Sequence, residues 1–139
     1  MRILVLNGPN LNLLGSREVS IYGDQSFDDY AKELAEQFPE HTFTFRQSNL
    51  EGELVTWIQE AKGQFDGLVI NPGGYAHTSV AIADALAYLD IPKIEVHISH
   101  LYKRESFRHQ MITATACDGV ISGLGLKGYA LAVRALASA

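Results

Sequence analysis

Short runs of consecutive apolar residues alternate along the chain with longer segments in which apolar residues recur every three or four positions. The runs are bounded by Gly, Pro, Asn or Ser, a pattern typical of strands that are buried on both faces. They predict five strands, at residues 3–6, 42–46, 68–70, 93–98 and 119–121. The periodic segments predict helices at residues 27–38, 50–61, 79–89 and 126–137, with a further short helix near 104–110.

Alternation of strands and helices is typical of βαβ units, which build a parallel sheet. With five strands, we expect an α/β fold of flavodoxin-like order, with helices on both faces of the sheet. The absence of repeats and linkers in the sequence predicts a single catalytic domain over residues 1–139. Ligands of such sheets bind beyond the carboxyl ends of the strands, so the loops after the first, third and fourth strands are the places to expect a site.

The predicted helix at residues 79–89 is apolar almost all round. Only Asp84 and the hydroxyl of Tyr88 interrupt this character between residues 80 and 89. A helix of this kind is buried on both sides, but a domain of this size has only one sheet to cover it. We therefore expect a second copy of the chain to cover the other side, which predicts a homo-oligomer.

The composition narrows the function. Of 139 residues, 47% are hydrophobic and 19% charged, as in a globular domain, and the net charge of -5 argues against binding nucleic acid. Cys117 is the single cysteine, which rules out a disulfide framework and a cysteine-based zinc site. The first apolar run is too short for a signal peptide, and no run approaches the length of a membrane span. We expect a cytoplasmic protein that has no membrane partner.

The connection after the first strand, residues 7–23, is long enough to act as a lid or a binding loop. It lacks the glycine spacing of a phosphate-binding loop. Asn10, Asn12, Arg17 and Tyr22 are its candidate functional residues. The simpler alternative is that Arg17 is solvated and Tyr22 packs within the loop.

The loop after the third strand carries two adjacent glycines, which allow a ligand to approach the backbone, or which form an ordinary turn before a helix. At the end of the fourth strand, Glu95, His97 and Ser99 share one face. The carboxylate can orient the imidazole, or the histidine is purely structural. We expect no metal, because no third ligand accompanies His97 and His100. The spacing of Arg104 and Arg108 predicts one helix face, either solvated or a clamp for carboxylate and hydroxyl groups.

Taken together, these segments resemble the type II 3-dehydroquinate dehydratase family. The matching segments occur in family order at residues 6–23, 46–52, 71–79, 94–108 and 123–129. Each segment is weakly specific, but the set covers the chain almost from end to end.

The resemblance implies trans-elimination of water from 3-dehydroquinate to give 3-dehydroshikimate through an enolate, without a cofactor, by a dodecamer built from trimers. It implies that Tyr22 is the general base, that His97 is the general acid, and that Arg17 lies beside Tyr22 on a mobile lid. A nearby guanidinium suits this base, because it favours the charged form of a phenol. Asn10 is expected to help hold a water that stabilises the enolate. The substrate-binding residues are expected to be Asn71, His77, Ile98, Ser99 and Arg108, and Asp84 is expected to reach the site of a neighbouring subunit.

The sequence departs from the family pattern at three positions. Val19 replaces a common proline, His100 stands where Asn is frequent, and Tyr102 stands where His is frequent.

Two other functional classes share this fold and are the alternatives to a dehydratase. A flavodoxin needs a hydroxyl-rich phosphate loop after the first strand, and the segment with Pro9 and Asn10 is a poor one. A receiver-type module needs acidic residues at the ends of the first and third strands, where this chain has Asn7 and Asn71.

Overall fold

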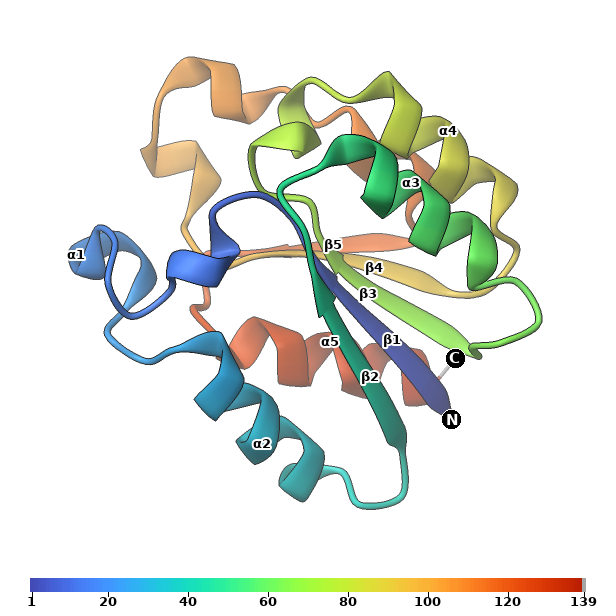
Figure 1. Ribbon diagram of the computed structural model, residues 1–139. Helices are drawn as coiled ribbons and strands as arrows, with labels where there is room; N and C mark the ends of the chain where they lie inside the picture. The colour runs from blue at the N-terminus through green and yellow to red at the C-terminus, as the bar shows by residue number, and fades with distance from the viewer. Residues whose placement is uncertain (139) are drawn as a thin grey trace.

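The computed structural model, which describes residues 1–138, is built on one five-stranded sheet (Figure 1). The strands are β1 (Arg2–Asn7), β2 (Thr42–Gln47), β3 (Gly67–Asn71), β4 (Lys93–His97) and β5 (Gly119–Ser122). Their order in the sheet is β2-β1-β3-β4-β5, and every neighbouring pair is parallel. This is the flavodoxin-like arrangement that the sequence predicts.

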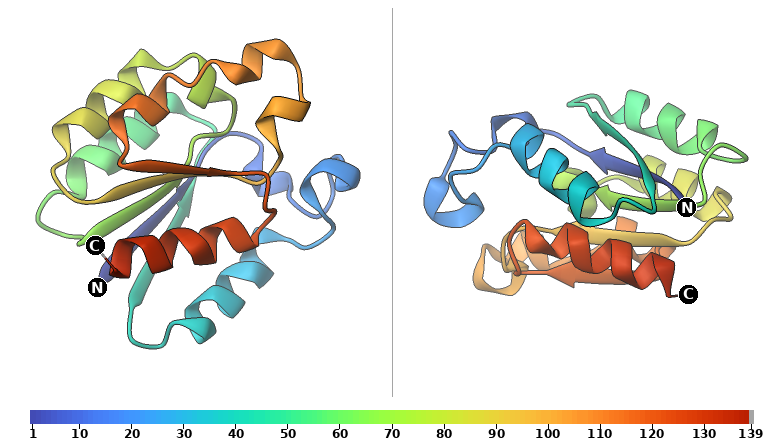
Figure 2. Two further views of the ribbon diagram at one scale, coloured as in Figure 1. Left: turned by 180° about the vertical axis from the view of Figure 1, so that it is seen from behind. Right: turned by 90° about the horizontal axis from the view of Figure 1, so that it is seen from below.

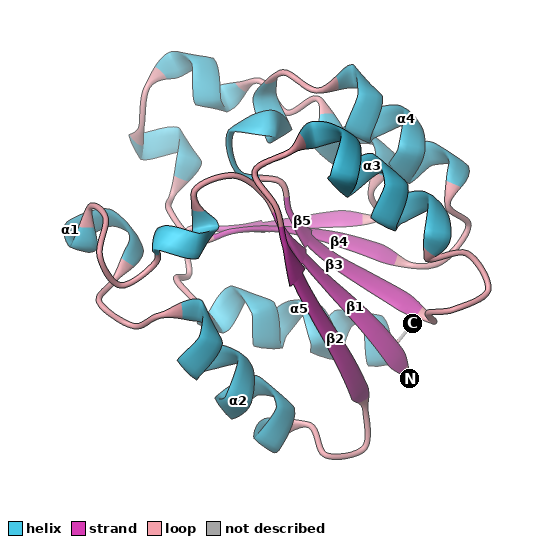
Figure 3. Cartoon of the chain, viewed as in Figure 1, coloured by secondary structure: helices cyan, strands magenta, loops and turns pink. Residues whose placement is uncertain are grey.

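Helices cover both faces of the sheet, as the rear and lower views show (Figure 2). The α-helices are α1 (Val19–Tyr22), α2 (Phe27–Gln37), α3 (Glu51–Glu60), α4 (Val80–Tyr88) and α5 (Lys127–Ala137). Helices α2 and α5 lie on one face, and α3 and α4 lie on the other (Figure 3). The 3₁₀ helices are η1 (Leu11–Leu13), η2 (Gly73–His77), η3 (Leu101–Lys103), η4 (Ser106–His109) and η5 (Thr113–Ala116). The four long predicted helices are confirmed.

The short helix predicted near 104–110 differs from the structure. Arg104 lies outside any helix, between η3 and η4, and Arg108 belongs to the four-residue η4. The spacing of four that predicted one helix face therefore does not describe these arginines. Isolated turns of this length are too short to give a periodic apolar pattern.

Two serines begin the helices that flank the site. Ser26 accepts a hydrogen bond from the backbone N–H of Asp29 at the start of α2. Ser79 accepts one from the N–H of Ile82 at the start of α4. Each bond satisfies a backbone donor that has no partner within the helix, which fixes where the helix begins.

The apolar runs are buried because alternate strand residues enter different layers of core. Ile3 and Val5 pack in the cluster formed with α2 and α5, whereas Leu4 and Leu6 pack in the cluster formed with α3 and α4. All four side chains are fully buried. Burial on both faces explains why β1 appears in the sequence as a continuous apolar run.

Helix α4 buries one side in this chain and exposes the other. Ile82, Ala85 and Leu86 are buried, whereas Val80 is 61% exposed and Tyr88 is 57% exposed. The isolated chain therefore leaves uncovered an apolar face of α4 that the sequence predicts to be buried by a second subunit.

The two ends of the described chain meet at the amino ends of the strands, opposite the loops expected to carry the site. Side-chain atoms of Met1 and Leu136 both lie within 3.4 Å of the place where a Cβ on Gly67 would be. Within residues 1–138, no helix is long and apolar enough to cross a membrane.

Candidate active site

A cavity of about 130 Å³ opens at the carboxyl ends of β1, β3 and β4. Its walls come from the three loops predicted to carry chemistry. They are formed by Pro9, Asn10, Leu11, Arg17, Tyr22, Asn71, Gly73, Gly74, His77, His97, Ile98, Ser99, Leu101, Arg104 and Arg108. Every residue that the family resemblance assigns to the site lines this cavity except Asp84, which lies exposed on α4. Asn12, the further candidate in the loop after β1, does not line it. Tyr22, Arg17 and His97 therefore share one cavity.

The loops after β1 and β3 are joined where Gly8 meets the end of β3. The N–H of Gly8 donates to the carbonyl of Asn71 at 2.8 Å. A Cβ on Gly8 would lie 2.4 Å from the carbonyl oxygen of Pro72, so only glycine allows this approach. This contact brings the segments of Asn10 and Asn71 to the same cavity.

Tyr22 ends the short helix α1, which begins after a strained residue. Glu18 has a φ of +38°, and its carbonyl accepts from the N–H groups of Ile21 and Tyr22. Val19 takes the first position of α1, where proline is favoured because the N–H there has no helical partner. The departure from the family's proline therefore removes no hydrogen bond of the helix.

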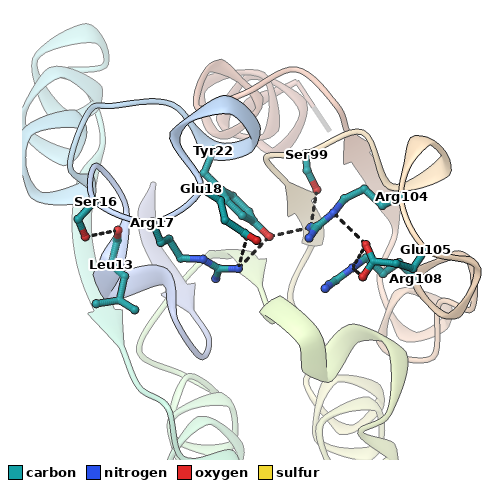
Figure 4. Close-up of polar contacts among 9 residues, drawn as sticks. All are labelled: Leu13, Ser16, Arg17, Glu18, Tyr22, Ser99, Arg104, Glu105 and Arg108. Carbon is teal, nitrogen blue, oxygen red and sulfur yellow. Dashed lines mark hydrogen bonds and ion pairs between the residues drawn. The ribbon is translucent and has the colours of Figure 1, made fainter.

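The Tyr22 hydroxyl oxygen lies between two guanidinium groups (Figure 4). It accepts a hydrogen bond from Arg104 Nη1 at 2.7 Å and one from Arg17 Nη2 at 3.3 Å. Arg104 Nη1 also donates to Ser99 Oγ at 3.2 Å, and the Arg104 side chain is only 11% exposed. The phenol oxygen therefore receives charge-assisted hydrogen bonds from two cationic side chains.

Arg104 is the contact that the site prediction did not include. The sequence placed it within a matching segment and offered it as a clamp for carboxylate or hydroxyl groups, but nothing in the spacing paired it with Tyr22. The two residues are 82 positions apart. Only the fold brings them together.

The cavity is locally basic in a chain whose net charge is negative. Arg17, Arg104 and Arg108 all face it, and two exposed carboxylates partner them at its rim. Glu18 lies 3.1 Å from Arg17, and Glu105 lies 3.3 Å from Arg108. A local cluster of arginines of this kind attracts a small anion whatever the overall charge.

His97 is held by a buried carboxylate. Its Nε2 lies 2.7 Å from Glu95 Oε2, and Glu95 is completely buried. With this carboxylate as the acceptor, Nε2 is the donor of the pair, which leaves Nδ1 as the other ring nitrogen. The face shared by Glu95 and His97 in the predicted strand is thus confirmed as a direct contact.

His77 lies beside His97 in surroundings that favour the neutral form of its imidazole. The two ring centroids are 6.1 Å apart, and His77 Nδ1 lies 2.8 Å from the carbonyl oxygen of Gln110. Burial is the main cause that lowers the pKa of His77 below 6.5, and the nearby His97 and Arg108 lower it further. With Nδ1 donating to the carbonyl, Nε2 of the neutral ring is an acceptor for a ligand hydroxyl.

The two asparagines of the cavity are anchored from behind. The Asn10 backbone N–H donates to Asn49 Oδ1 at 3.0 Å, which gives the segment after β2 a supporting role. Asn71 Oδ1 accepts from the N–H of Gly73, and its Nδ2 donates to the buried Tyr129 hydroxyl at 3.0 Å. Burial raises the pKa of Tyr129 far above that of a free phenol, so it remains a neutral bridge.

The arrangement suits proton transfer. A phenol flanked by two arginines and an imidazole held by a carboxylate line the same small cavity, and each of these two rings can act as a general acid or base. Across residues 1–138, no group of three or more His, Cys, Asp or Glu side chains is arranged to hold a metal ion.

Comparison with known proteins agrees with this fold and shows the family. The family model described as dehydroquinase class II matches residues 1–137. The 3-dehydroquinate dehydratase of Idiomarina loihiensis is 56% identical over 137 residues, which cover 96% of this chain and 90% of that protein. The crystal structure of type II dehydroquinase from Butyrivibrio crossotus superposes with a TM-score of 0.96 at 48% identity, covering 99% of this chain and 97% of that one. The corresponding structure from Propionibacterium acnes gives a TM-score of 0.95 at 46% identity, with 99% and 97% coverage. This chain belongs to the class II dehydroquinase family.

Proposed function

We propose that this chain, acting as one catalytic domain, is a 3-dehydroquinate dehydratase that eliminates water in the trans sense to give 3-dehydroshikimate. Family membership supports the reaction, and its relatives carry this name. The observation that carries the proposed mechanism is the position of the Tyr22 oxygen, between Arg17 and Arg104 on the cavity that His97 also lines.

In the first step, Tyr22 acts as the general base. Its phenolate takes the proton from the carbon next to the ketone, and the electrons of the broken C–H bond form an enolate. Arg17 and Arg104 stabilise the phenolate before this step. Asn10 helps to hold the water that stabilises the enolate oxygen, a role for which its position on the cavity wall is suitable.

In the second step, His97 acts as the general acid. The enolate collapses, the C–O bond to the leaving hydroxyl breaks, and His97 gives that hydroxyl a proton so that it departs as water. Glu95 stabilises the imidazolium before the transfer and keeps the ring oriented afterwards. Return of the proton from Tyr22 to His97, through solvent, restores the resting enzyme.

The remaining cavity residues bind the substrate. Ile98 and Ser99 receive its carboxylate, in a part of the cavity that Arg104 makes positive. Neutral His77 accepts a hydrogen bond from a substrate hydroxyl, and Asn71 and Arg108 hold the other polar groups. The lid that carries Arg17 and Tyr22 closes over the substrate and excludes water, which strengthens these charge interactions.

The enzyme acts as a homo-oligomer, a dodecamer built from trimers. The support within the chain is the uncovered apolar face of α4, with Val80 and Tyr88 exposed. In the proposed assembly Asp84, which is also exposed on α4, reaches the site of a neighbouring subunit. Light scattering of the purified protein tests this assembly. A Tyr88→Glu variant is expected to lower the mass, because it puts a charge on a face that would be buried.

The protein works in the cytoplasm, in the shikimate pathway towards chorismate and aromatic amino acids or in the breakdown of quinate. Both pathways use the same reaction, so the site supports either. Growth of a strain that lacks its own dehydroquinase, with and without added aromatic amino acids, measures the biosynthetic role.

The decisive experiment mixes the purified protein with 3-dehydroquinate and follows the ultraviolet absorbance of the conjugated product. We expect rapid product formation from the wild type and a fall in kcat of at least about 100-fold for Tyr22→Phe, since a general base contributes on this scale. Tyr102→Phe is the matched control, because Tyr102 is 68% exposed and does not line the cavity. No signal from the wild type refutes the reaction, and an undiminished signal from Tyr22→Phe refutes the base.

A further inference from the structure

Behind His97, two buried side chains form a continuous hydrogen-bonded chain that leads away from the cavity. Glu95 Oε2 contacts His97 Nε2 at 2.7 Å, and Glu95 Oε1 accepts from the Thr113 hydroxyl at 2.5 Å. Glu95 and Thr113 are both completely buried, and His97 is only 5% exposed. Each oxygen of this carboxylate therefore has a fixed protein partner, away from solvent.

The Thr113 bond controls a rotation that the His97 bond alone leaves free. The carboxylate of a glutamate turns easily about its last side-chain bond, because this torsion is broad and roughly two-fold. If only one carboxylate oxygen of Glu95 were held, by the imidazole of His97, rotation of the carboxylate would move the His97 ring as well. A donor on the second oxygen fixes the plane of the carboxylate, and so fixes the direction from which Nε2–H of His97 is accepted.

Thr113 itself is held by its surroundings. It begins η5, which packs against α4, and the preceding residue, Ile112, donates its N–H to the carbonyl of Ala76 at 2.8 Å. Ala76 precedes His77 of the cavity wall. The hydroxyl thus comes from a segment anchored both to α4 and to the loop after β3, and neither anchor depends on β4.

We propose that Thr113 is a positioning residue for the dehydration, whose hydroxyl fixes the Glu95 carboxylate so that His97 keeps a single tautomer with Nδ1 directed to the cavity. This inference rests on the proposed function for its kinetic consequence, but not for its structural one. An unheld Glu95 lets the neutral imidazole sample the other tautomer and lets the ring turn, so that once the ring is protonated its Nδ1–H is no longer held in line with the leaving hydroxyl.

Two substitutions separate the hydroxyl from the shape of the side chain. Thr113→Val keeps the shape and removes the donor, whereas Thr113→Ser keeps the donor and removes a methyl group. For Thr113→Val we expect kcat to fall about tenfold with KM unchanged, since the residue touches no substrate and tenfold matches the loss of one charge-assisted hydrogen bond of about 1.4 kcal/mol. For Thr113→Ser we expect kcat within about twofold of the wild type.

The second measurement does not depend on turnover. Nitrogen-15 NMR of histidine-labelled protein, with His97 assigned through a His97→Gln spectrum, reports the tautomer. We expect one tautomer in the wild type and Thr113→Ser, and a mixture in Thr113→Val. If Thr113→Val does not fold, Thr113→Ala is compared with Thr113→Ser, because both lack the methyl group and differ only in the hydroxyl.

The outcomes separate this inference from the proposed function. A single His97 tautomer in Thr113→Val overturns the positioning role, as does an equal loss of kcat in Thr113→Val and Thr113→Ser. A wild type that shows one tautomer and forms no product refutes the proposed function instead, while a tautomer mixture in Thr113→Val still supports the structural part of the inference.

Discussion

Replacing Arg104 with glutamine tests the electrostatic reasoning about Tyr22 most directly. The substitution removes a positive charge that donates to the phenol oxygen at 2.7 Å from a side chain only 11% exposed. Glutamine is shorter and neutral, and it keeps an amide NH2 group as a hydrogen-bond donor. If the arginine stabilises a phenolate, the variant has less of the base form and a weaker reaction.

The expected magnitude follows from the distance and the partial burial. A guanidinium and a phenolate about 4 Å apart attract each other by roughly 4 kcal/mol at an effective dielectric constant of 20. Arg17 still donates to the same oxygen in the variant, and water replaces part of the lost interaction. We therefore expect about half of this energy to be lost, ~2 kcal/mol, which corresponds to a fall of roughly 30-fold in kcat.

The assay compares Arg104→Gln with Arg104→Lys and with Arg134→Gln. Lysine restores the charge without the planar fork and is expected to recover part of the loss. Arg134 of α5, whose guanidinium lies over the Phe38 ring, is a control arginine that does not line the cavity. A kcat of Arg104→Gln within threefold of the wild type, in a protein with unchanged thermal stability, would refute the assigned role of this charge.

Three further predictions concern other parts of the molecule. Gly8→Ala is expected to lower the free energy of unfolding by about 2 kcal/mol or more in chemical denaturation, because its Cβ would meet the Pro72 carbonyl, whereas Gly74→Ala, with open space around it, is expected to change little. The lowered pKa of His77 means that the folded state binds this proton less well than the unfolded state, so the protein loses stability as the pH falls below 6.5. His77→Gln is therefore expected to lose less free energy of unfolding than the wild type between pH 7 and 5.5, and an unchanged loss would contradict this. Burial raises the pKa of Cys117 to about 12, so its reaction with a thiol reagent at pH 8 is expected to be roughly 1000-fold slower in the native than in the unfolded protein, and equal rates would show that the thiol is accessible.

Regular elements were predictable because their signals are local. The strand that contains Ile3 to Leu6 is a continuous apolar run, and Ser26 precedes an apolar stripe at helical spacing, so both could be identified from neighbours in the sequence. The cavity was predictable in outline for a different reason. Parallel strands direct their carboxyl ends to one edge, so the loops carrying Tyr22, Asn71 and His97 had to converge.

Contacts between distant residues were not predictable in the same way. The bond from Arg104 to Tyr22 joins residues 82 positions apart, and the bond from Thr113 to Glu95 joins a 3₁₀ turn to a strand. A four-residue helix such as the one that ends at Tyr22 has no periodic pattern to detect. The prediction that Arg104 and Arg108 share one helix face was wrong for the same reason, because both side chains reach the cavity from short, irregular turns.

The meeting of Met1 and Leu136 at the amino ends of the strands makes the chain suitable for circular permutation. A short peptide linker from Ser138 to Met1 would join the ends, and a new start could be cut at the exposed turn after Gly63, where nothing crowds the backbone. Both junctions lie at the amino ends of the strands, whereas the cavity lies at their carboxyl ends. Reporter domains or surface tethers attached at any of these points would therefore leave the mouth of the cavity open.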